Sequence, residues 1–334
     1  MPVQFMGDIM IRKFILVLGI LIWTTMCGTA SAGELGIITG GAKGTYFQFG
    51  LNLKELGKKF GYNIHVYNSR GSVENVYAVY KRPKTEMGIV QSDVLAFVLK
   101  VQSNKVLKSI ARKTKMVFPL YNEEVHLLGK TEVASFDDLE NRRVAVDKEG
   151  SGTYLTAKLL FEVSGIKPAQ TLAVGTDDAL SMLKAGTIDA MFYVAGFPVA
   201  LFSEQVTVGD GLHIVPIGNK SITEFYPVAQ IPAGTYPWQS QSVSTVAVKA
   251  VLVSFDFRGS NCDSVGEFAN IVYDNLEWLK QNGHPKWKSV DLDYPLKGWD
   301  QYDCVKKHRR GGNPRETGQP MEENPLLDAI KEML

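Results

Sequence analysis

The strongest constraint on the fold is a unit that repeats along the first part of the chain: a short apolar strand, a loop of small polar residues, and an amphipathic helix. In its first copy the apolar run 35–39 leads through the glycine-rich loop 40–44 into a helix expected at 45–60. The second copy has a strand expected at 64–68 and a helix that begins near Ser72, and the third has a strand expected at 87–90 and a helix from near Ser92 to about Val101. Strands that alternate with helices predict a parallel sheet covered on both faces, and therefore an α/β fold.

A second series of the same kind follows an extended stretch at 115–129. Strands are expected at 143–146, 171–174 and 188–194. The helices between them are expected from the loop 147–152 to about Gly165, and over 177–185. The chain then becomes extended and turn-rich as far as Val253.

Two series of this size exceed what one core usually fills, so two lobes are expected. The chain would pass between the lobes near 118–128 and again near 222–245, and two such connections can act as a hinge around a cleft. The predicted parts are lobe one at 33–120, lobe two at 121–225, the return to lobe one with C-terminal helices at 226–305, and a mobile polar tail at 306–334.

Residues 1–32 have the pattern of a secretory signal peptide. Arg12 and Lys13 precede about ten apolar residues, and a small-residue site at Ala30-Ser31-Ala32 follows. The apolar run is too short to span a bilayer as a stable helix, so cleavage near Ala32 and export to the periplasm are expected. Translation starting at Met1 or at Met10 and lipidation of Cys27 stay open.

Export changes how the three cysteines are interpreted. Cys27 leaves with the signal, and Cys262 and Cys304 remain in an oxidising compartment, where we expect them to pair. The closed loop of about 40 residues corresponds to roughly 4 kcal/mol in the chain-entropy model. Two separate buried thiols are the alternative.

Composition argues against several classes of function. The 36 Lys and Arg residues nearly balance 35 Asp and Glu, so no basic excess favours nucleic acid. The five histidines show no metal-binding spacing, so neither a metal nor another cofactor is expected. Phosphate-loop, dinucleotide and nucleophile-elbow motifs are absent. Glu123, Glu124 and His126 fall on the expected hinge strand and are interpreted as surface charges.

The small-residue loops share one place in the predicted sheet. Ligands of open parallel sheets bind beyond the carboxyl ends of the strands, where free backbone N–H groups and helix dipoles favour a carboxylate or phosphate. The groups expected there are Gly44-Thr45-Tyr46, Ser72-Val73-Glu74-Asn75, Gln91-Ser92-Asp93 and Gly150-Ser151-Gly152-Thr153. Taken singly, each could be only a turn or a helix cap.

This ordered series of loops, followed by Gly186 and Ile188-Asp189-Ala190, resembles the TAXI family of extracytoplasmic solute-binding proteins over about 33–295. The resemblance implies a two-lobe periplasmic-binding-protein fold of type II and delivery of a small organic anion, such as glutamate or a related dicarboxylate, to the membrane permease subunits of a TRAP-type transporter. It also implies ligand contacts from Gly44, Thr45, Tyr46, Ser72, Glu74, Asn75, Gln91, Ser92, Ser151, Gly152, Thr153 and the backbone around Gly196. Lys43 and Arg70 add positive charge beside this site.

Three hypotheses follow. The leading one is a periplasmic receptor without catalysis that captures a small carboxylate and passes it to a permease. The second is a sensory adaptor whose cleft signals to a membrane partner. The third is an exported enzyme that uses Ser72 or Ser151, although no histidine stands at an identifiable spacing from either.

Overall fold

The computed structural model describes residues 33–93, 98, 105–296 and 298–309, and those after Gly33 belong to one compact unit. The expected signal peptide, most of the helix expected after Ser92 and the polar tail from 310 onward lie outside the described residues, so they stay predictions. Within the described ranges, no helix combines the length and apolar character needed to cross a bilayer.

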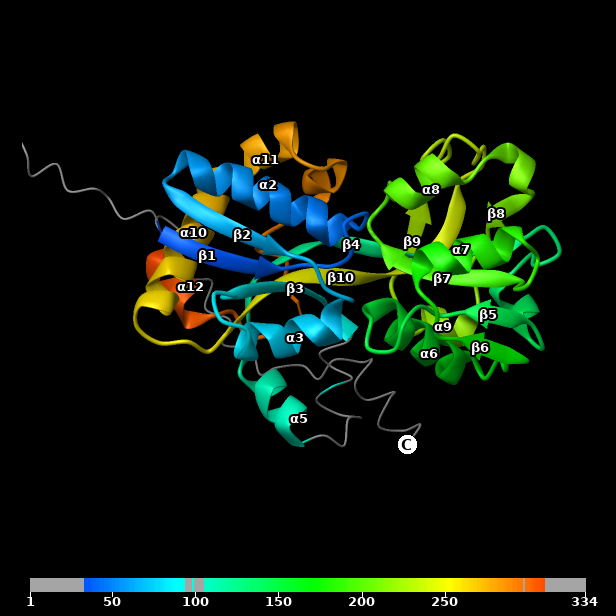
Figure 1. The fold of residues 1–334 in the computed structure, drawn as a ribbon, viewed down its shortest axis with the longest axis horizontal. Coiled ribbons are helices and arrows are strands. Elements are labelled where there is room, and N and C mark those ends of the chain that lie inside the picture. The colour runs from blue at the N-terminus through cyan, green and yellow to red at the C-terminus, as the bar shows by residue number, and fades with distance from the viewer. Residues whose placement is uncertain (1–32, 94–97, 99–104, 297, 310–334) are drawn as a thin grey trace, which may run out of the picture. The chain divides into compact units, whose positions relative to one another are not determined.

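Strands and helices alternate as expected (Figure 1). The strands are β1 (Gly33–Ile38), β2 (Tyr62–Tyr67), β3 (Met87–Gln91), β4 (Thr114–Lys130), β5 (Arg143–Ala145), β6 (Gln170–Leu172), β7 (Ala190–Ala195), β8 (Leu212–Ile214), β9 (Val228–Ile231) and β10 (Val243–Phe255). The α-helices are α2 (Thr45–Lys59), α3 (Ser72–Lys81), α5 (Lys105–Arg112), α6 (Gly152–Ser164), α7 (Thr176–Lys184), α8 (Ala200–Gln205), α9 (Lys220–Thr223), α10 (Ser260–Asp274), α11 (Leu276–Asn282) and α12 (Asp303–His308). Short 3-10 helices are η1 (Phe136–Leu139), η2 (Val208–Asp210) and η3 (Pro285–Ser289).

The described strands form one connected sheet in the order β2-β1-β3-β10-β4-β7-β5-β6, with β8 beside β4 and β9 beside β10. β1 pairs in parallel with β3, and β5 pairs in parallel with β6 and β7, as alternation of strands and helices predicts. The two long strands between these groups differ, because β10 is antiparallel to β3 and β4, and β4 is antiparallel to β7. The sheet is therefore mixed, although the sequence predicted a parallel one.

Each half of the sheet has its own core. We call β1–β3 with α2, α3, α5 and α10–α12 lobe one, and β5–β9 with α6–α9 lobe two; β4 and β10 run through both. In lobe one, Phe49 of α2 packs with Phe118 and Phe268, and in lobe two Leu160 of α6 packs with Phe192. The apolar spacing that predicted these helices is thus the face that each helix buries against the sheet.

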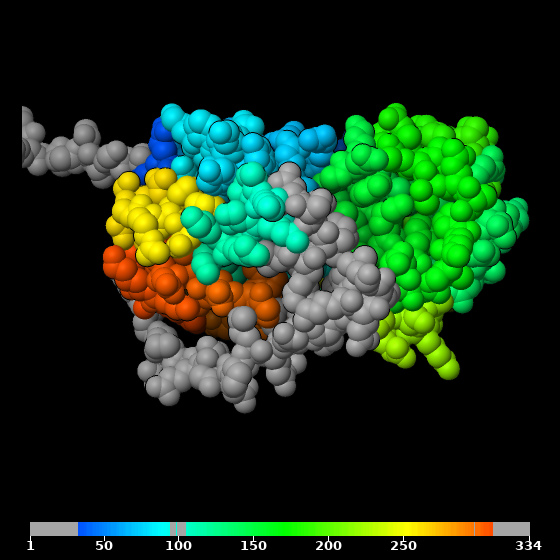
Figure 2. All heavy atoms as spheres, turned by 90° about the horizontal axis from the view of Figure 1, so that it is seen from below, coloured from blue at the N-terminus to red at the C-terminus, as the bar shows by residue number. Residues whose placement is uncertain are grey.

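Lobe one is built from both ends of the described chain. In Figure 2, blue and cyan atoms from the first strands and helices gather with yellow and orange atoms from 250–309, while green atoms from the middle of the chain gather apart from them. Lobe one therefore takes its chain from both sides of lobe two in the sequence.

The return to lobe one occurs later than the sequence indicated. Residues 226–242 were expected to begin the return, yet Tyr226, Ile231 and Tyr236 pack in the cores of lobe two. β10 makes the crossing itself, because Val243–Val246 pair with β9 and Ala250–Ser254 pair with β3. A single long strand that hydrogen-bonds in both lobes left no turn signal by which to place the crossing.

The C-terminal part of lobe one is covalently fixed. Cys262 on α10 and Cys304 on α12 form the expected disulfide, with Cα atoms 5.5 Å apart. α12 continues to His308, whose Nδ1 donates to the Cys304 carbonyl at 2.8 Å. The sequence suggested that the mobile tail begins at residue 306. Residues 306–308 are instead helical, as the last part of α12.

Candidate functional site

The candidate site is a cavity of about 300 Å³ where the two lobes meet. Its walls come from four strand-to-helix loops, which lead into α2 and α3 of lobe one and into α6 and α7 of lobe two, and from β4 and β7. The lining residues are Gly40, Gly41, Gly44, Thr45, Tyr46, Ser69, Arg70, Gly71, Ser72, Gln91, Glu123, Asp147, Lys148, Ser151, Gly152, Thr153, Gly175, Thr176, Asp177, Asp178, Tyr193, Val194 and Ala195.

The structure brings eight of the twelve proposed ligand contacts to this cavity. They come from all four loop groups that the sequence singled out: Gly44, Thr45, Tyr46, Ser72, Gln91, Ser151, Gly152 and Thr153. Segments separated by more than a hundred residues therefore share one cavity, which is the arrangement that topology predicts for strand-to-helix loops.

The other four lie outside the lining and have structural contacts instead. Asn75 donates its side-chain amide to the carbonyls of Thr39 and Ile89, so it ties β1 to β3. Ser92 Oγ accepts a hydrogen bond from the Lys249 N–H, which joins Ser92 to β10.

Glu74 forms an exposed ion pair with Arg70, with Nε 2.9 Å from Oε2. The Gly196 carbonyl accepts a hydrogen bond from the Thr45 hydroxyl at 2.7 Å, which joins the two lobes beside the cavity. Both residues thus act on the border of the site and not in its lining.

The wall from lobe two is built around the first turn of α6. Ser151 caps the helix by accepting from the Tyr154 N–H at 3.0 Å, and Thr153 Oγ1 accepts from the Val194 N–H at 3.1 Å. No acidic residue stands in this first turn, whose partial positive charge favours an anion. The Asp147 carboxyl, which precedes the helix, interacts with the Ser151 side chain and offsets part of this charge. A carboxylate of a small ligand would be stabilised there.

The same wall touches lobe one at Gly152. A Cβ at this position would lie 1.5 Å from Gln91 Oε1 and 3.0 Å from Ser72 Oγ, so only glycine allows this approach. Gln91 is 2% exposed, and its Oε1 has no hydrogen-bond partner among the described residues. A buried amide oxygen without a partner beside a cavity is a position for a ligand donor.

The start of α7 has a different charge. Asp177 and Asp178 stand in its first turn, and Asp177 forms an exposed ion pair with Lys43 of lobe one, with Nζ 2.8 Å from Oδ1. Asp147 lies nearby, and burial raises the pKa of its carboxyl. Lys43 was expected to add positive charge to the site, but its charge is matched by Asp177.

Glu123 of β4 lines the cavity together with Tyr46. The Tyr46 hydroxyl donates to Glu123 Oε2 at 2.6 Å, and both residues are buried. Burial raises the pKa of Glu123, and the nearby Asp93 and Glu124 carboxylates raise it further, whereas Tyr46 and Lys286 act against this rise. Tyr46 is thus both a wall of the cavity and part of the core.

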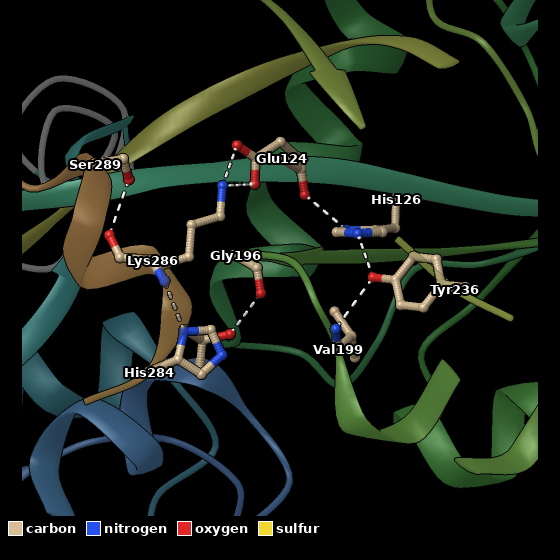
Figure 3. A network of polar contacts seen from close by, with 9 residues as sticks. Glu124, His126, Gly196, Val199, Tyr236, His284, Lys286 and Ser289 are labelled. Carbon is tan, nitrogen blue, oxygen red and sulfur yellow. Dashed lines mark hydrogen bonds and ion pairs between the residues drawn. The ribbon is translucent and has the colours of Figure 1, made fainter. Parts of the chain in front are cut away.

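The adjacent Glu124 belongs to a second network of polar contacts, which Figure 3 shows, and it does not line the cavity. Lys286 of η3 contacts both of its carboxylate oxygens, at 2.5 and 2.6 Å, and also lies 3.6 Å from the centre of the Phe197 ring. The Glu124 carbonyl accepts from His126 Nδ1 at 3.0 Å.

His126 connects this pair to lobe two. Tyr236 accepts a hydrogen bond from the Val199 N–H at 3.1 Å and donates its own proton to His126 Nε2 at 2.8 Å. His126 is therefore neutral with its proton on Nδ1, and burial lowers its pKa to about 3. Glu123, Glu124 and His126 are buried, which corrects their interpretation as surface charges; Lys286, far away in the sequence, neutralises Glu124.

Several lining residues were missed by the sequence argument. Glu123 and Tyr193 stand inside strands, and nothing local separates an inward-facing polar side chain from a solvated one. Asp147, Asp177 and Asp178 follow strand ends, as the selected loops do, so their position was a usable signal. Among the described residues no group of three or more His, Cys, Asp or Glu side chains could hold a metal ion.

Two α/β lobes joined by β4 and β10 around a cavity define the two-lobe periplasmic-binding-protein fold of type II. Two solved structures share this fold. The periplasmic binding protein BugD matches with a TM-score of 0.52 and 10% identity, over 78% of this chain and 88% of its own. MatC of Rhodopseudomonas palustris with bound malate matches with a TM-score of 0.51 and 18% identity, over 78% and 90%.

The sequence itself identifies the family. The family model of the NMT1-like family matches residues 37–299, which include every strand-to-helix loop of the cavity. The chain therefore belongs to the NMT1-like family.

Proposed function

We propose that this protein is an extracytoplasmic solute-binding receptor that captures a small carboxylate between its lobes and delivers it to TRAP-type permease subunits. The observation that carries the proposal is the cavity shared by both lobes, with eight of the selected loop residues in its lining. The TAXI resemblance supports the transporter class, and malate in the related fold of MatC supports a carboxylate ligand.

Contacts between the lobes support ligand capture by closure. Thr45 bonds Gly196, Lys43 pairs with Asp177, and Thr156 of α6 donates to Asp93 of lobe one at 2.8 Å. A ligand held by both walls would gain contacts in this arrangement that either lobe alone does not offer, and so would favour it over an open one.

A thermal-shift screen of the protein from residue 33 onward tests the proposal. We expect amino acids and organic acids to raise the melting temperature, because a ligand that binds only the folded state stabilises it. Stabilisation by sugars or peptides, with no effect of any carboxylate, would contradict the proposal.

A matched pair of variants places the ligand. Gln91→Met removes a lining amide whose oxygen has no hydrogen-bond partner in the described part of the chain, so we expect normal folding and a smaller ligand shift. Gln281→Met changes an exposed residue of α11 and should leave the shift unchanged. Equal shifts in both variants would place the ligand elsewhere.

Export is tested separately, by determining the N-terminal residue of the secreted protein. We expect this residue to be Gly33.

A further inference from the structure

Glu123 is the lining residue that is least expected in a site for an anion, because its side chain is a buried carboxyl group. Its side chain is 2% exposed, yet it lines the cavity, and its one hydrogen-bond partner among the described residues is the Tyr46 hydroxyl. The nearest buried cation, Lys286, uses its contacts on Glu124. A carboxyl group therefore faces the cavity without a cationic partner from the described part of the chain.

Acidic side chains also outnumber basic ones in the whole lining. Glu123, Asp147, Asp177 and Asp178 supply four carboxyl groups, against Arg70 and Lys148. Arg70 is in turn paired with Glu74, and Lys43 outside the lining with Asp177. A ligand with two negative charges and no positive charge would meet an acidic lining, whereas the first turn of α6 still favours one carboxylate.

We propose that Glu123 is a specificity-determining residue whose carboxylate receives a protonated amine of the ligand, while a carboxylate of the same ligand lies at the start of α6. The proposal rests on the carboxylate-receptor function and deepens it: the ligand class is an amino acid or a similar small zwitterion. Dicarboxylates without an amine are the poorer ligands.

Because Glu123 is buried, a cationic group of a ligand would stabilise its ionised form. An ionised carboxylate without a partner is costly in a site removed from water, and a cation that contacts it recovers this cost. Tyr46 occupies Oε2 and holds the side chain in place, so that Oε1 is left for the ligand. A hydrogen bond between two charged groups is about twice as strong as one between neutral groups.

The opposite use of Glu123 is a protonated carboxylic acid that donates to an anionic ligand. Burial and the neighbouring carboxylates raise the pKa of Glu123 and favour the protonated form while the cavity holds no cation. A protonated Glu123 would favour dicarboxylates and would strengthen their binding as the pH falls. Ligand preference and its pH dependence therefore distinguish this alternative from the proposal.

Isothermal titration with ligand pairs that differ only by an amine tests the proposal. Glutamate with glutarate and 4-aminobutyrate with butyrate are suitable pairs, measured at pH 8. We expect the amine-bearing member of at least one pair to bind about tenfold tighter to the natural protein, as a charge-assisted contact should provide. Glu123→Gln keeps the size of the side chain and an acceptor for Tyr46, and should bring this ratio close to one.

Two further variants separate the local contact from general charge. Asp178→Asn removes another lining carboxylate and should keep most of the preference for the amine. Glu55→Gln changes an exposed residue of α2 and should keep all of it.

Three results would overturn the proposal: equal binding within each pair, an unchanged ratio in Glu123→Gln, or an equal loss of the ratio in Asp178→Asn. If Glu123→Gln does not fold, the comparison of pairs in the natural protein decides. Absence of binding by every carboxylate would overturn the proposed function as well, whereas equal binding within pairs would leave that function intact.

Discussion

Two consecutive residues of β4 face different environments, and their comparison separates a structural carboxylate from one that faces the cavity. Glu123 and Glu124 are 2% and 4% exposed. Lys286 contacts both oxygens of Glu124, whereas Glu123 has a neutral tyrosine for a partner. Burial raises the pKa of both, and for Glu124 the charge of Lys286 is the main effect that opposes this rise. The partner therefore decides what a buried carboxylate can do, because burial alone is the same for both.

The largest effect on stability is expected when Glu124 loses its cation and becomes, like Glu123, a buried carboxyl group without one. Lys286→Met leaves Glu124 buried without a cation, and we expect a loss of about 3–5 kcal/mol in the free energy of unfolding. Urea denaturation followed by circular dichroism measures it. Adding Glu124→Gln should recover most of the loss, and Lys306→Met, which breaks an exposed pair, should have little effect. A stable Lys286→Met protein would show that the pair is not needed.

A smaller effect is expected in how stability depends on pH. The folded state raises the pKa of Glu123, so it holds the proton more tightly than the unfolded state does, and stability falls as the pH rises from the unfolded value through the folded one. Glu123→Gln lacks this contribution. Its stability relative to the natural protein should therefore increase with pH in that window, by up to about 1.4 kcal/mol per pH unit.

Urea unfolding from pH 5 to pH 9 measures the difference, with Glu55→Gln as the control. The groups that act on Glu123 are Tyr46, Asp93, Glu124 and Lys286, and they remain in the variant. Parallel curves for Glu123→Gln and the natural protein would contradict the prediction.

The smallest effect is expected at the hydrogen bond between Tyr46 and Glu123. Tyr46→Phe removes a buried donor 2.6 Å from Oε2, and we expect a loss of about 1 kcal/mol in the free energy of unfolding. In the Glu123→Gln background the loss should be smaller, because a neutral acceptor replaces a carboxyl group. A double-mutant cycle by urea denaturation measures this coupling, and a coupling of zero would exclude the bond as a stabilising contact.

Much of the fold was predictable because local patterns determine it. Helices α2, α3, α6 and α7 begin within one residue of the expected positions, since their loops and apolar spacings mark both the first turn and the buried face. The antiparallel direction of β4 and β10 was not predictable. An extended segment has the same alternation of side chains whichever way its neighbours run.

The candidate site was predictable as far as it is made of loops. Eight selected residues line the cavity because strand-to-helix loops meet at one edge of each parallel group. Asn75 and Ser92 were selected by the same pattern, yet they bond backbone groups of strands instead. Glu123 was missed, since its place in the lining depends on which face of β4 meets the cavity, and that depends on pairing with β10.

The pairing of β4 and β10 also limits where residues can be inserted into or deleted from β4. Val248 is opposite Glu123 and Ala247 is opposite Glu124. The pairing has two register irregularities before Asn122, where an extra residue can be absorbed. Inserting or deleting one residue between Asn122 and Glu124 would instead exchange the faces of the strand, and Lys286 would contact the wrong carboxylate. Length variation among close relatives should therefore fall in the surface loops or at these irregularities, and β4 between Asn122 and Glu124 should keep a constant number of residues.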